Sequence, residues 1–137
     1  MASLKFDVAL SFAGEQRDYV RRVAEILESN GIKVFFDEFY KSHLWGKDMT
    51  VYFQEVYYSN SNWCIMFASK EYVEKAWPSY ERKNALAKEL EVKDGYILPV
   101  RFDDTDVPGL LPTINYLDAQ NETPEDIARL FLEKMEE

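Results

Sequence analysis

Two short apolar runs separated by an amphipathic segment fill the first 36 residues, and this order restricts the fold more than any other feature of the chain. The runs at residues 6–12 and 32–36 have the length and apolar content of buried strands. Residues 16–30 between them carry apolar side chains at helical spacing, and Gly31 suits the end of a helix. A strand, a helix and a strand with short links predict a right-handed unit of two parallel strands.

The same alternation continues to the end of the chain. Three further strands are expected, at residues 63–68, 96–102 and 114–117. Helices are expected at residues 48–58, 70–75 and 78–92, with a last one after the cap at Thr123. Five strands alternating with helices predict an α/β, flavodoxin-like fold of three layers, with a parallel sheet in the order 2-1-3-4-5. Residues 1–137 are expected to form one domain.

Charge and composition exclude several classes of function. The net charge is −9, with 25 acidic and 16 basic residues and no basic run. Binding to nucleic acid or to an anionic membrane surface is therefore not expected. The single cysteine, Cys64, and the single histidine, His43, leave no internal disulfide and no cysteine-cluster or multi-histidine metal site. We expect a cytoplasmic protein without a metal or an organic cofactor.

In open parallel sheets, ligands bind at the carboxyl ends of the strands, next to the point where the strand order reverses. For the order 2-1-3-4-5 this point lies between the first and third strands. Residues 11–14, Ser69 and the helix entrance that carries Trp77 and Glu81 should meet there. The aromatic loop at residues 39–47 should border the same crevice.

The helix entrance combines an aromatic ring with a carboxylate. Pro78 suits the first position of a helix, which places Glu81 in its first turn. Trp77 precedes Glu81 by four residues, so the two side chains should lie close together. Such a pair can hold a flat, cationic or sugar-bearing ligand. The alternative is structural: acidic residues favour first turns because of the helix dipole, and a tryptophan before a helix often serves as a packing anchor.

Six segments of the chain resemble, in order, the conserved motifs of Toll/interleukin-1 receptor (TIR) domains. They are the first strand Asp7-Val8-Ala9-Leu10-Ser11-Phe12, the second strand Val34-Phe35-Phe36-Asp37, the BB loop at residues 39–48, the third strand end Met66-Phe67-Ala68-Ser69, the motif Trp77-x-x-x-Glu81, and the fourth strand Ile97-Leu98-Pro99-Val100. In the order and number of these matches, the chain resembles bacterial TIR domains of the NAD-cleaving subgroup.

This resemblance implies an activity and a set of residues. In catalytic TIR domains the glutamate of the Trp-x-x-x-Glu motif is required to cleave NAD⁺ between nicotinamide and ribose, which implies that Glu81 is catalytic. The implied substrate-binding residues are Phe12, Ala13, Trp45, Lys47 and Trp77. NAD⁺ is then the substrate and not a cofactor. The chain departs from the family at Pro78, where a cysteine is frequent, and at Ala13-Gly14, where some relatives carry basic residues.

A single carboxylate is sufficient for this chemistry. Ordinary glycosidases need a second acid to protonate a poor leaving group, whereas nicotinamide leaves NAD⁺ as a neutral molecule. The enzyme must instead stabilise an oxocarbenium-like ribose, which an anion beside the ring can do. Attack by water gives ADP-ribose, and attack by a group of the same molecule gives a cyclic ADP-ribose. The resemblance places this reaction in antiphage or immune signalling, activated by TIR–TIR self-association that can be filamentous, with a sensor or effector partner.

Three other functions share features with this sequence. A non-catalytic TIR scaffold would act through residues 39–47 and would turn over no substrate. A nucleoside deoxyribosyltransferase-like enzyme shares the sheet and uses a glutamate nucleophile, but it would act on free nucleosides. A phosphoacceptor receiver domain needs an aspartate at the end of the third strand, where this chain has Ser69.

Overall fold

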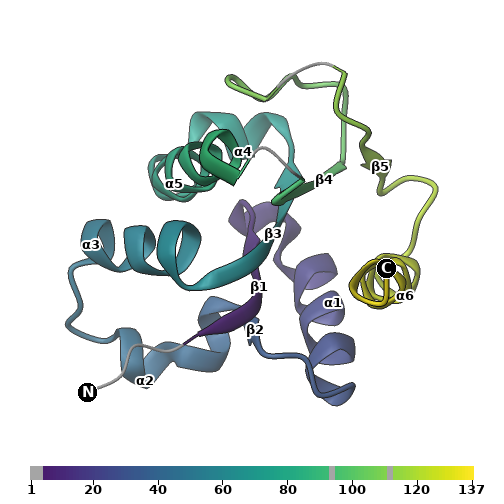
Figure 1. The fold of residues 1–137 in the computed structure, drawn as a ribbon. Helices are drawn as coiled ribbons and strands as arrows, with labels where there is room; N and C mark the ends of the chain where they lie inside the picture. Colours follow the sequence, from purple (N-terminus) through teal and green to yellow (C-terminus); the bar gives the residue numbers. More distant parts are fainter. Residues whose placement is uncertain (1–4, 93–94, 111–112) are drawn as a thin grey trace.

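A parallel five-stranded sheet forms the centre of the computed structural model, which describes residues 5–92, 95–110 and 113–137, without the side chains of residues 76–80 and 92 (Figure 1). The strand order is β2-β1-β3-β4-β5, and every pair is parallel, as the sequence predicted. The strands are β1 (Phe6–Ser11), β2 (Val34–Phe35), β3 (Ser61–Ala68), β4 (Ile97–Arg101) and β5 (Leu117–Asp118).

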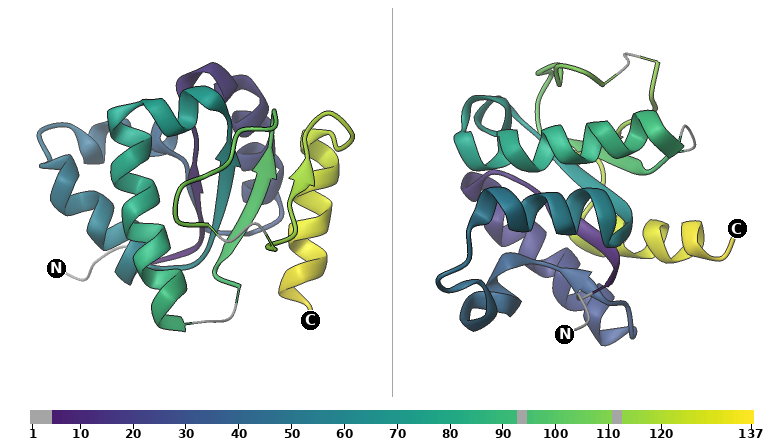
Figure 2. Two further views of the ribbon diagram at one scale, coloured as in Figure 1. Left: turned by 90° about the horizontal axis from the view of Figure 1, so that it is seen from above. Right: turned by 60° about the vertical axis from the view of Figure 1, so that its left-hand side comes forward.

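Helices cover both faces of this sheet (Figures 1 and 2). One face packs against α1 (Arg17–Ser29) and α6 (Pro124–Met135), which also contact each other. The opposite face packs against α3 (Met49–Gln54), α4 (Lys70–Glu74) and α5 (Ala76–Val92). Shorter turns connect these elements: the 3₁₀ helices η1 (Gly14–Gln16) and η2 (Asp37–Tyr40), the helix α2 (Lys41–Leu44) and the π-helical turn η3 (Glu55–Ser59).

From Val8 to Phe12, the side chains at the end of β1 alternate between the two faces, as in a strand that is buried on both sides. Val8, Leu10 and Phe12 pack in the core beneath α1 and α6. Ala9 packs in the core on the other face, and the Ser11 hydroxyl points to that face as well, where it meets residues of α4 and α5. This alternation fixes which side chains at the end of β1 can reach α5.

The last strand differs from its prediction. It is Leu117–Asp118 and not residues 114–117, because among the described residues that follow β4 these two pair with it, at Val100 and Arg101. The described residues between β4 and β5 contain no helix, so the regular alternation of strands and helices fails there. Pro99 directly precedes the two residues of β4 that pair with β5.

The segment at residues 39–47 was predicted to be a loop but contains helical turns. The Phe39 N–H donates to the Phe36 carbonyl at 2.9 Å, and the Trp45 N–H donates to the Lys41 carbonyl at 3.0 Å. Gly46 then ends this helical segment with a φ of +84°, a conformation that glycine adopts without strain. The helical turns set the direction of the Trp45 side chain at the carboxyl edge of the sheet.

None of the helices in the described residues is both long and apolar enough to cross a lipid bilayer.

Candidate active site

Glu81 lies on α5, in the second turn of the helix and not in the first. The helix begins at Ala76, so Pro78 is its third residue and Glu81 its sixth. The prediction of a first-turn glutamate was therefore wrong. A proline is tolerated anywhere in the first turn because the N–H groups there have no partner within the helix. From this position in the second turn of α5, the half-buried Glu81 side chain reaches the end of β1.

Ser11 provides the direct contact between Glu81 and the sheet. Its hydroxyl donates to Glu81 Oε1 at 2.9 Å and lies 2.6 Å from the hydroxyl of Tyr72. Ser69 caps α4 by accepting the Tyr72 N–H at 3.1 Å, which holds Tyr72 over the strand end. Ser11 and Glu81 therefore meet at the end of β1, as the strand order predicted, and Ser69 at the end of β3 is linked to them through Tyr72.

Two kinds of interaction have opposite effects on the pKa of Glu81. Burial raises its pKa to about 8, and the negative charge of Asp37 acts in the same direction. The hydrogen bond from Ser11 and the backbone N–H of Phe12 favour the ionised form. A carboxyl group with a pKa in this range exchanges its proton near neutral pH, as general acids and bases of enzymes do.

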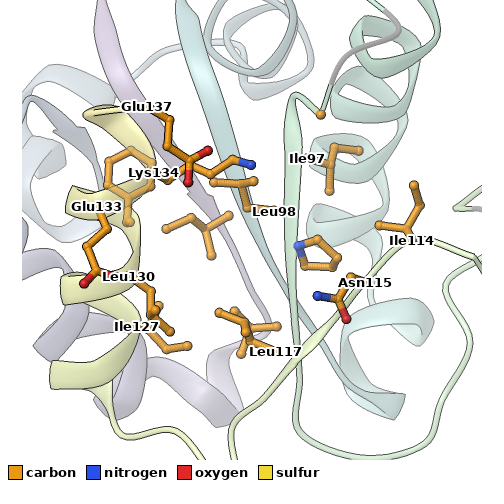
Figure 3. Close-up of a pocket in the computed structure, with 15 residues that line it drawn as sticks. Ile97, Leu98, Ile114, Asn115, Leu117, Ile127, Leu130, Glu133, Lys134 and Glu137 are labelled. Carbon is orange, nitrogen blue, oxygen red and sulfur yellow. The ribbon is translucent and has the colours of Figure 1, made fainter.

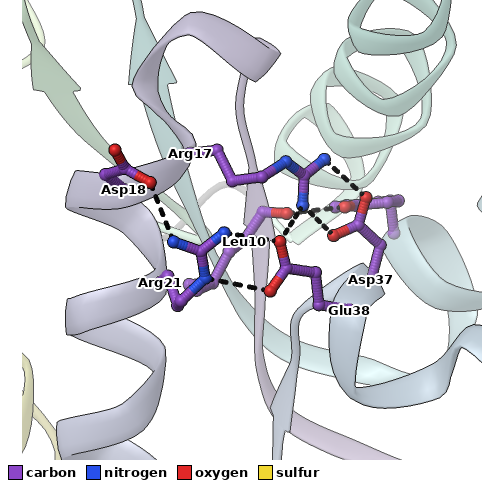
Figure 4. Close-up of polar contacts among 7 residues, drawn as sticks. Leu10, Arg17, Asp18, Arg21, Asp37 and Glu38 are labelled. Carbon is purple, nitrogen blue, oxygen red and sulfur yellow. Dashed lines mark hydrogen bonds and ion pairs between the residues drawn. The ribbon is translucent and has the colours of Figure 1, made fainter.

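Beside Glu81, two arginines of α1 hold two carboxylates of η2 (Figure 4). Arg17 binds both oxygens of Asp37, at 2.8 and 3.1 Å, and reaches Glu38 at 3.2 Å. Arg21 binds both oxygens of Glu38, at 2.7 and 2.9 Å. The hydrogen bonds from Arg21 lower the pKa of Glu38 to about 2. Glu38 therefore stays ionised near neutral pH, and the network ties the start of η2 to α1.

A pocket of about 500 Å³ opens at this network, and we call it the charged pocket. Its lining comprises Arg17, Asp37, Glu38, Lys41, Leu44 and Trp45. The Trp45 side chain is 89% exposed, which leaves an aromatic surface free at the rim. Because Asp37 lines the pocket and also acts on the charge of Glu81, the pocket and the carboxylate belong to one region at the carboxyl edge of the sheet.

The predicted binding residues lie at different distances from this region. Trp45 lines the charged pocket, and Lys47 follows it in an exposed turn. The Phe12 ring points away from Glu81, because it stacks on Phe36 at 5.5 Å and lies 4.9 Å below the Arg17 guanidinium. Ala13 is completely buried. The side chain of Trp77 lies outside the described part of the structure, so its expected proximity to Glu81 remains a prediction.

The site also contains residues that sequence reasoning did not select. Tyr57 and Tyr72 fall within expected helices and Asp37 within the second-strand motif, but none of them was selected as a site residue, and neither was Arg17. A signal was available for the tyrosines, since a buried tyrosine needs a partner for its hydroxyl. No comparable signal marked the contact of Arg17 with Asp37, which joins residues 20 positions apart across two elements.

A second hollow lies between β4 and α6, and we call it the apolar groove (Figure 3). Its volume is about 400 Å³, and its walls include Leu98, Leu117, Ile127 and Leu130. Glu133 and Lys134, from the last turn of α6, and Glu137, which follows the helix, contribute charged side chains. The groove exists because β5 is short and the described residues that lead to it form no covering helix.

The acidic segment that follows β4 binds backbone groups. Asp103 accepts the Lys70 N–H at 3.0 Å and the Thr105 N–H at 2.9 Å. In the residues that the structure describes, no three histidine, cysteine, aspartate or glutamate side chains are grouped as they would be around a metal ion. The polar chemistry of this region is that of a turn.

Two known proteins that are similar to this chain are named as a cyclic ADP-ribose synthase and an NAD(+) hydrolase. The chain is 45% identical over 133 residues to the 3′ cyclic ADP-D-ribose synthase AaTIR of Aquimarina amphilecti, covering 97% of this chain and 41% of that protein. It is 37% identical over 100 residues to the NAD(+) hydrolase TcpA of Theionarchaea archaeon (strain DG-70-1), covering 72% of this chain and 29% of that protein. The chain thus spans less than half the length of either relative.

A solved structure confirms the architecture. The TIR domain of the Toll-related receptor TRR-2 from Hydra magnipapillata superimposes with a TM-score of 0.71 at 22% identity, covering 96% of this chain and 95% of that one. A family model described as "TIR domain" matches residues 8–131, which include every strand of the sheet except the first two residues of β1. The chain therefore belongs to the TIR domain family.

Proposed function

We propose that this TIR domain cleaves the bond between nicotinamide and ribose in NAD⁺, with Glu81 as the catalytic carboxylate. The observation that carries the proposal is the contact of Glu81 with the buried Ser11 at the carboxyl end of β1, beside the charged pocket. The relatives named as an NAD(+) hydrolase and a cyclic ADP-ribose synthase support this reaction. The chain spans only part of the length of these relatives. Its own substrate and activity are therefore part of the proposal.

The reaction needs an anion close to the ribose. As the bond between C1′ of the ribose and the ring nitrogen breaks, both bonding electrons leave with nicotinamide, which becomes neutral. The positive charge passes to the ribose, where the ionised Glu81 stabilises it. Attack of water at C1′, with loss of a proton, gives ADP-ribose. Attack by a nucleophile of the same molecule gives a cyclic product, the kind made by a synthase such as AaTIR.

The substrate itself favours the reactive form of Glu81. The nicotinamide ring of NAD⁺ carries a positive charge, and an adjacent positive charge favours a carboxylate over a carboxylic acid. The free enzyme holds Glu81 with a pKa of about 8. Binding of NAD⁺ would therefore release a proton at neutral pH and leave the carboxylate ionised beside the ribose.

The charged pocket supplies groups for the rest of the dinucleotide. Arg17 and Lys41 offer positive charge for the diphosphate, and the exposed Trp45 ring offers a surface for a base. Phe12 and Ala13 would act through the backbone at the end of β1, while Lys47 and Trp77 complete the proposed binding set. The proposed reaction needs neither an organic cofactor nor a metal.

We also propose that the domain works in an assembly of TIR domains in the cytoplasm, in antiphage or immune signalling. The exposed Trp45 and the partly exposed Phe39 lie on one segment and would contact a neighbouring copy. An assembly that completes the site predicts an activity per molecule that falls on dilution. An activity per molecule that is constant over a hundredfold dilution would contradict this part of the proposal. A scaffold without catalysis is not favoured, because the relatives above are named as enzymes.

The direct test is to incubate concentrated protein with NAD⁺ and to separate nicotinamide and the ribose products by chromatography. We expect nicotinamide release by the wild type and a loss of about 100-fold or more in Glu81→Gln, which removes the stabilising charge. The mass of the product separates hydrolysis from cyclisation. Glu91→Gln, an exposed change in the last turns of the same helix, should retain activity. Equal rates for the wild type and Glu81→Gln would refute the role of Glu81.

A further inference from the structure

The two carboxylates of the charged pocket can accept more hydrogen bonds than the described part of the protein gives them (Figure 4). Asp37 accepts one bond from Arg17 on each oxygen, at 2.8 and 3.1 Å. Glu38 accepts from both arginines on Oε1 and from Arg21 alone, at 2.9 Å, on Oε2. Because an ionised carboxylate has about four acceptor positions, about two remain open on Asp37 and about one on Glu38.

These open acceptors belong to side chains that a ligand can reach. The Asp37 side chain is 43% exposed and the Glu38 side chain 26%, and both line the charged pocket. A ligand that uses them must donate hydrogen bonds. The adjacent 2′- and 3′-hydroxyls of a ribose are such donors, whereas an ionised phosphate group mainly accepts hydrogen bonds.

The same carboxylates offset the charge of the two arginines. Arg17 forms paired bonds with Asp37, and Arg21 forms paired bonds with Glu38. The lining of the pocket carries two positive side chains, Arg17 and Lys41, and two negative ones, Asp37 and Glu38. The pocket therefore has no excess positive charge for a further phosphate, and a phosphate placed beside Asp37 and Glu38 would meet like charges.

The rim of the pocket indicates which ribose these carboxylates would meet. The proposed function places the nicotinamide ribose at Glu81 and the base at the other end of NAD⁺ on the exposed ring of Trp45. That base is attached directly to its own ribose. Because Trp45, Asp37 and Glu38 line one pocket, a base on Trp45 brings this second ribose to the two carboxylates. In NADP⁺ the 2′-hydroxyl of this ribose carries a phosphate.

We propose that Asp37 and Glu38 bind the hydroxyls of the ribose remote from nicotinamide and repel a 2′-phosphate there, so that the domain selects NAD⁺ over NADP⁺. This inference rests on the proposed function and deepens it by naming the substrate class that the pocket accepts. Other dinucleotide-binding sheets show the same chemistry, since an acidic side chain there binds the 2′-hydroxyl and an arginine accommodates the 2′-phosphate. In this chain both kinds of residue are present, and the carboxylates hold the arginines.

The test compares the binding of ADP-ribose and ADP-ribose 2′-phosphate to concentrated protein by isothermal titration calorimetry. These two compounds differ only in the phosphate that the proposal concerns. The wild type should bind ADP-ribose more tightly by about tenfold or more, the scale of a like-charge contact at a partly exposed site. The double variant Asp37→Asn, Glu38→Gln removes the repulsion and releases Arg17 and Arg21. It should bind ADP-ribose about threefold more weakly and the 2′-phosphate about tenfold more tightly than the wild type.

A merely structural role of the two carboxylates would weaken both ligands alike and would not change their ratio. Glu125→Gln is the matched control, because it removes a carboxylate that pairs with Arg22 of α1 at 3.3 Å outside the pocket, and it should leave both affinities unchanged. If the double variant fails to fold, Glu38→Gln decides, since it keeps the paired bonds of Arg17 with Asp37. It should shift the ratio toward the 2′-phosphate, and an unchanged ratio would overturn the proposal.

The binding experiment separates this inference from the proposed function, because neither compound contains the bond that is cleaved. A wild type that releases no nicotinamide would refute the activity, yet the ratio of affinities would still decide the selection. A wild type that binds both compounds equally, prefers the 2′-phosphate, or binds neither at millimolar concentration would overturn the inference. If the enzyme is active, the ratio of kcat/KM for NADP⁺ to that for NAD⁺ should rise in the double variant, and an unchanged ratio would overturn the inference as well.

Discussion

The charged pocket and the apolar groove have similar volumes, about 500 and 400 Å³, but they differ in the chemistry of their walls. The charged pocket lies at the carboxyl edge of the sheet, where α1 and η2 bring two arginines and two carboxylates close to Glu81. The apolar groove lies beyond β4, where a short fifth strand leaves aliphatic side chains uncovered (Figure 3).

This difference shows that the chemistry of a hollow depends on how the fold creates it and not on its size. The charged pocket follows from the topology, since the reversal of the strand order between β1 and β3 leaves a crevice at the strand ends in any sheet of this order. The apolar groove follows from what this chain lacks between β4 and β5 in its described residues. Three substitutions test whether the two hollows differ in function as they do in chemistry.

The largest effect should be on stability at alkaline pH. The folded state raises the pKa of Glu81 to about 8, above the value near 4.5 of an unperturbed glutamate. Below pH 4.5 Glu81 is neutral in the folded and unfolded states, and the folded protein keeps its full stability. As the pH rises from 4.5 to about 8, the unfolded state ionises first, and stability is lost. Glu81→Gln removes this loss and should be more stable than the wild type by about 2–4 kcal/mol at pH 9, at 1.36 kcal/mol per pKa unit and allowing for partial exposure.

Urea unfolding of both proteins at pH 5 and pH 9 measures this effect. The advantage of Glu81→Gln should shrink toward pH 5, where most of the penalty is absent from the wild type. A difference between the two proteins that does not change with pH would contradict the raised pKa. No residue of the apolar groove should show such a dependence at alkaline pH.

A smaller effect is expected from Arg17→Gln in the charged pocket. Without the guanidinium, Asp37 keeps its charge beside Glu81 and makes the ionised form of Glu81 less favourable. We expect kcat/KM for NAD⁺ to fall about tenfold, which corresponds to one pKa unit. Arg22→Gln on the same helix is the control, since Arg22 pairs with Glu125 at 3.3 Å on the other side of α1 and should leave the rate unchanged. Equal rates for both variants would remove Arg17 from the site.

The smallest effect on activity should come from the apolar groove. Leu130→Ala shortens a half-buried side chain of α6 and should cost about 1 kcal/mol of unfolding free energy, less than a fully buried leucine would. Its rate of nicotinamide release should stay within twofold of the wild type. A loss of tenfold or more with the fold intact would mean that the groove takes part in the reaction.

The sequence predicted the sheet because each strand is a compact apolar run and each helix has its own periodicity. It misplaced β5, where only Leu117 and Asp118 pair and no hydrophobic pattern marks the two residues. It treated residues 39–47 as a loop because their helical turns are too short to show a period. Local patterns therefore fixed the regular elements and failed for those that depend on a few tertiary contacts.

For the candidate site, the sequence predicted that Glu81 meets the end of β1, and the structure shows this contact. The residues around it depend on which face each strand and helix presents. The alternation of β1 turns Ser11 toward Glu81 and the Phe12 ring away from it. The start of α5 at Ala76 shifts Glu81 by a turn from its expected position. The Tyr72 hydroxyl, which contacts Ser11, and the charge of Asp37 act near Glu81 only through tertiary packing, which periodicity does not encode.

The pH dependence of NAD⁺ cleavage tests the central claim, that Glu81 acts as an ionised carboxylate beside the ribose, most directly. We predict that kcat/KM rises tenfold for each pH unit below about 8 and levels off above it, because this parameter follows the free enzyme. The limb of kcat should lie at lower pH, since bound NAD⁺ favours the ionised form. A kcat/KM that does not change between pH 6 and 9, or that is highest in acid, would contradict the account.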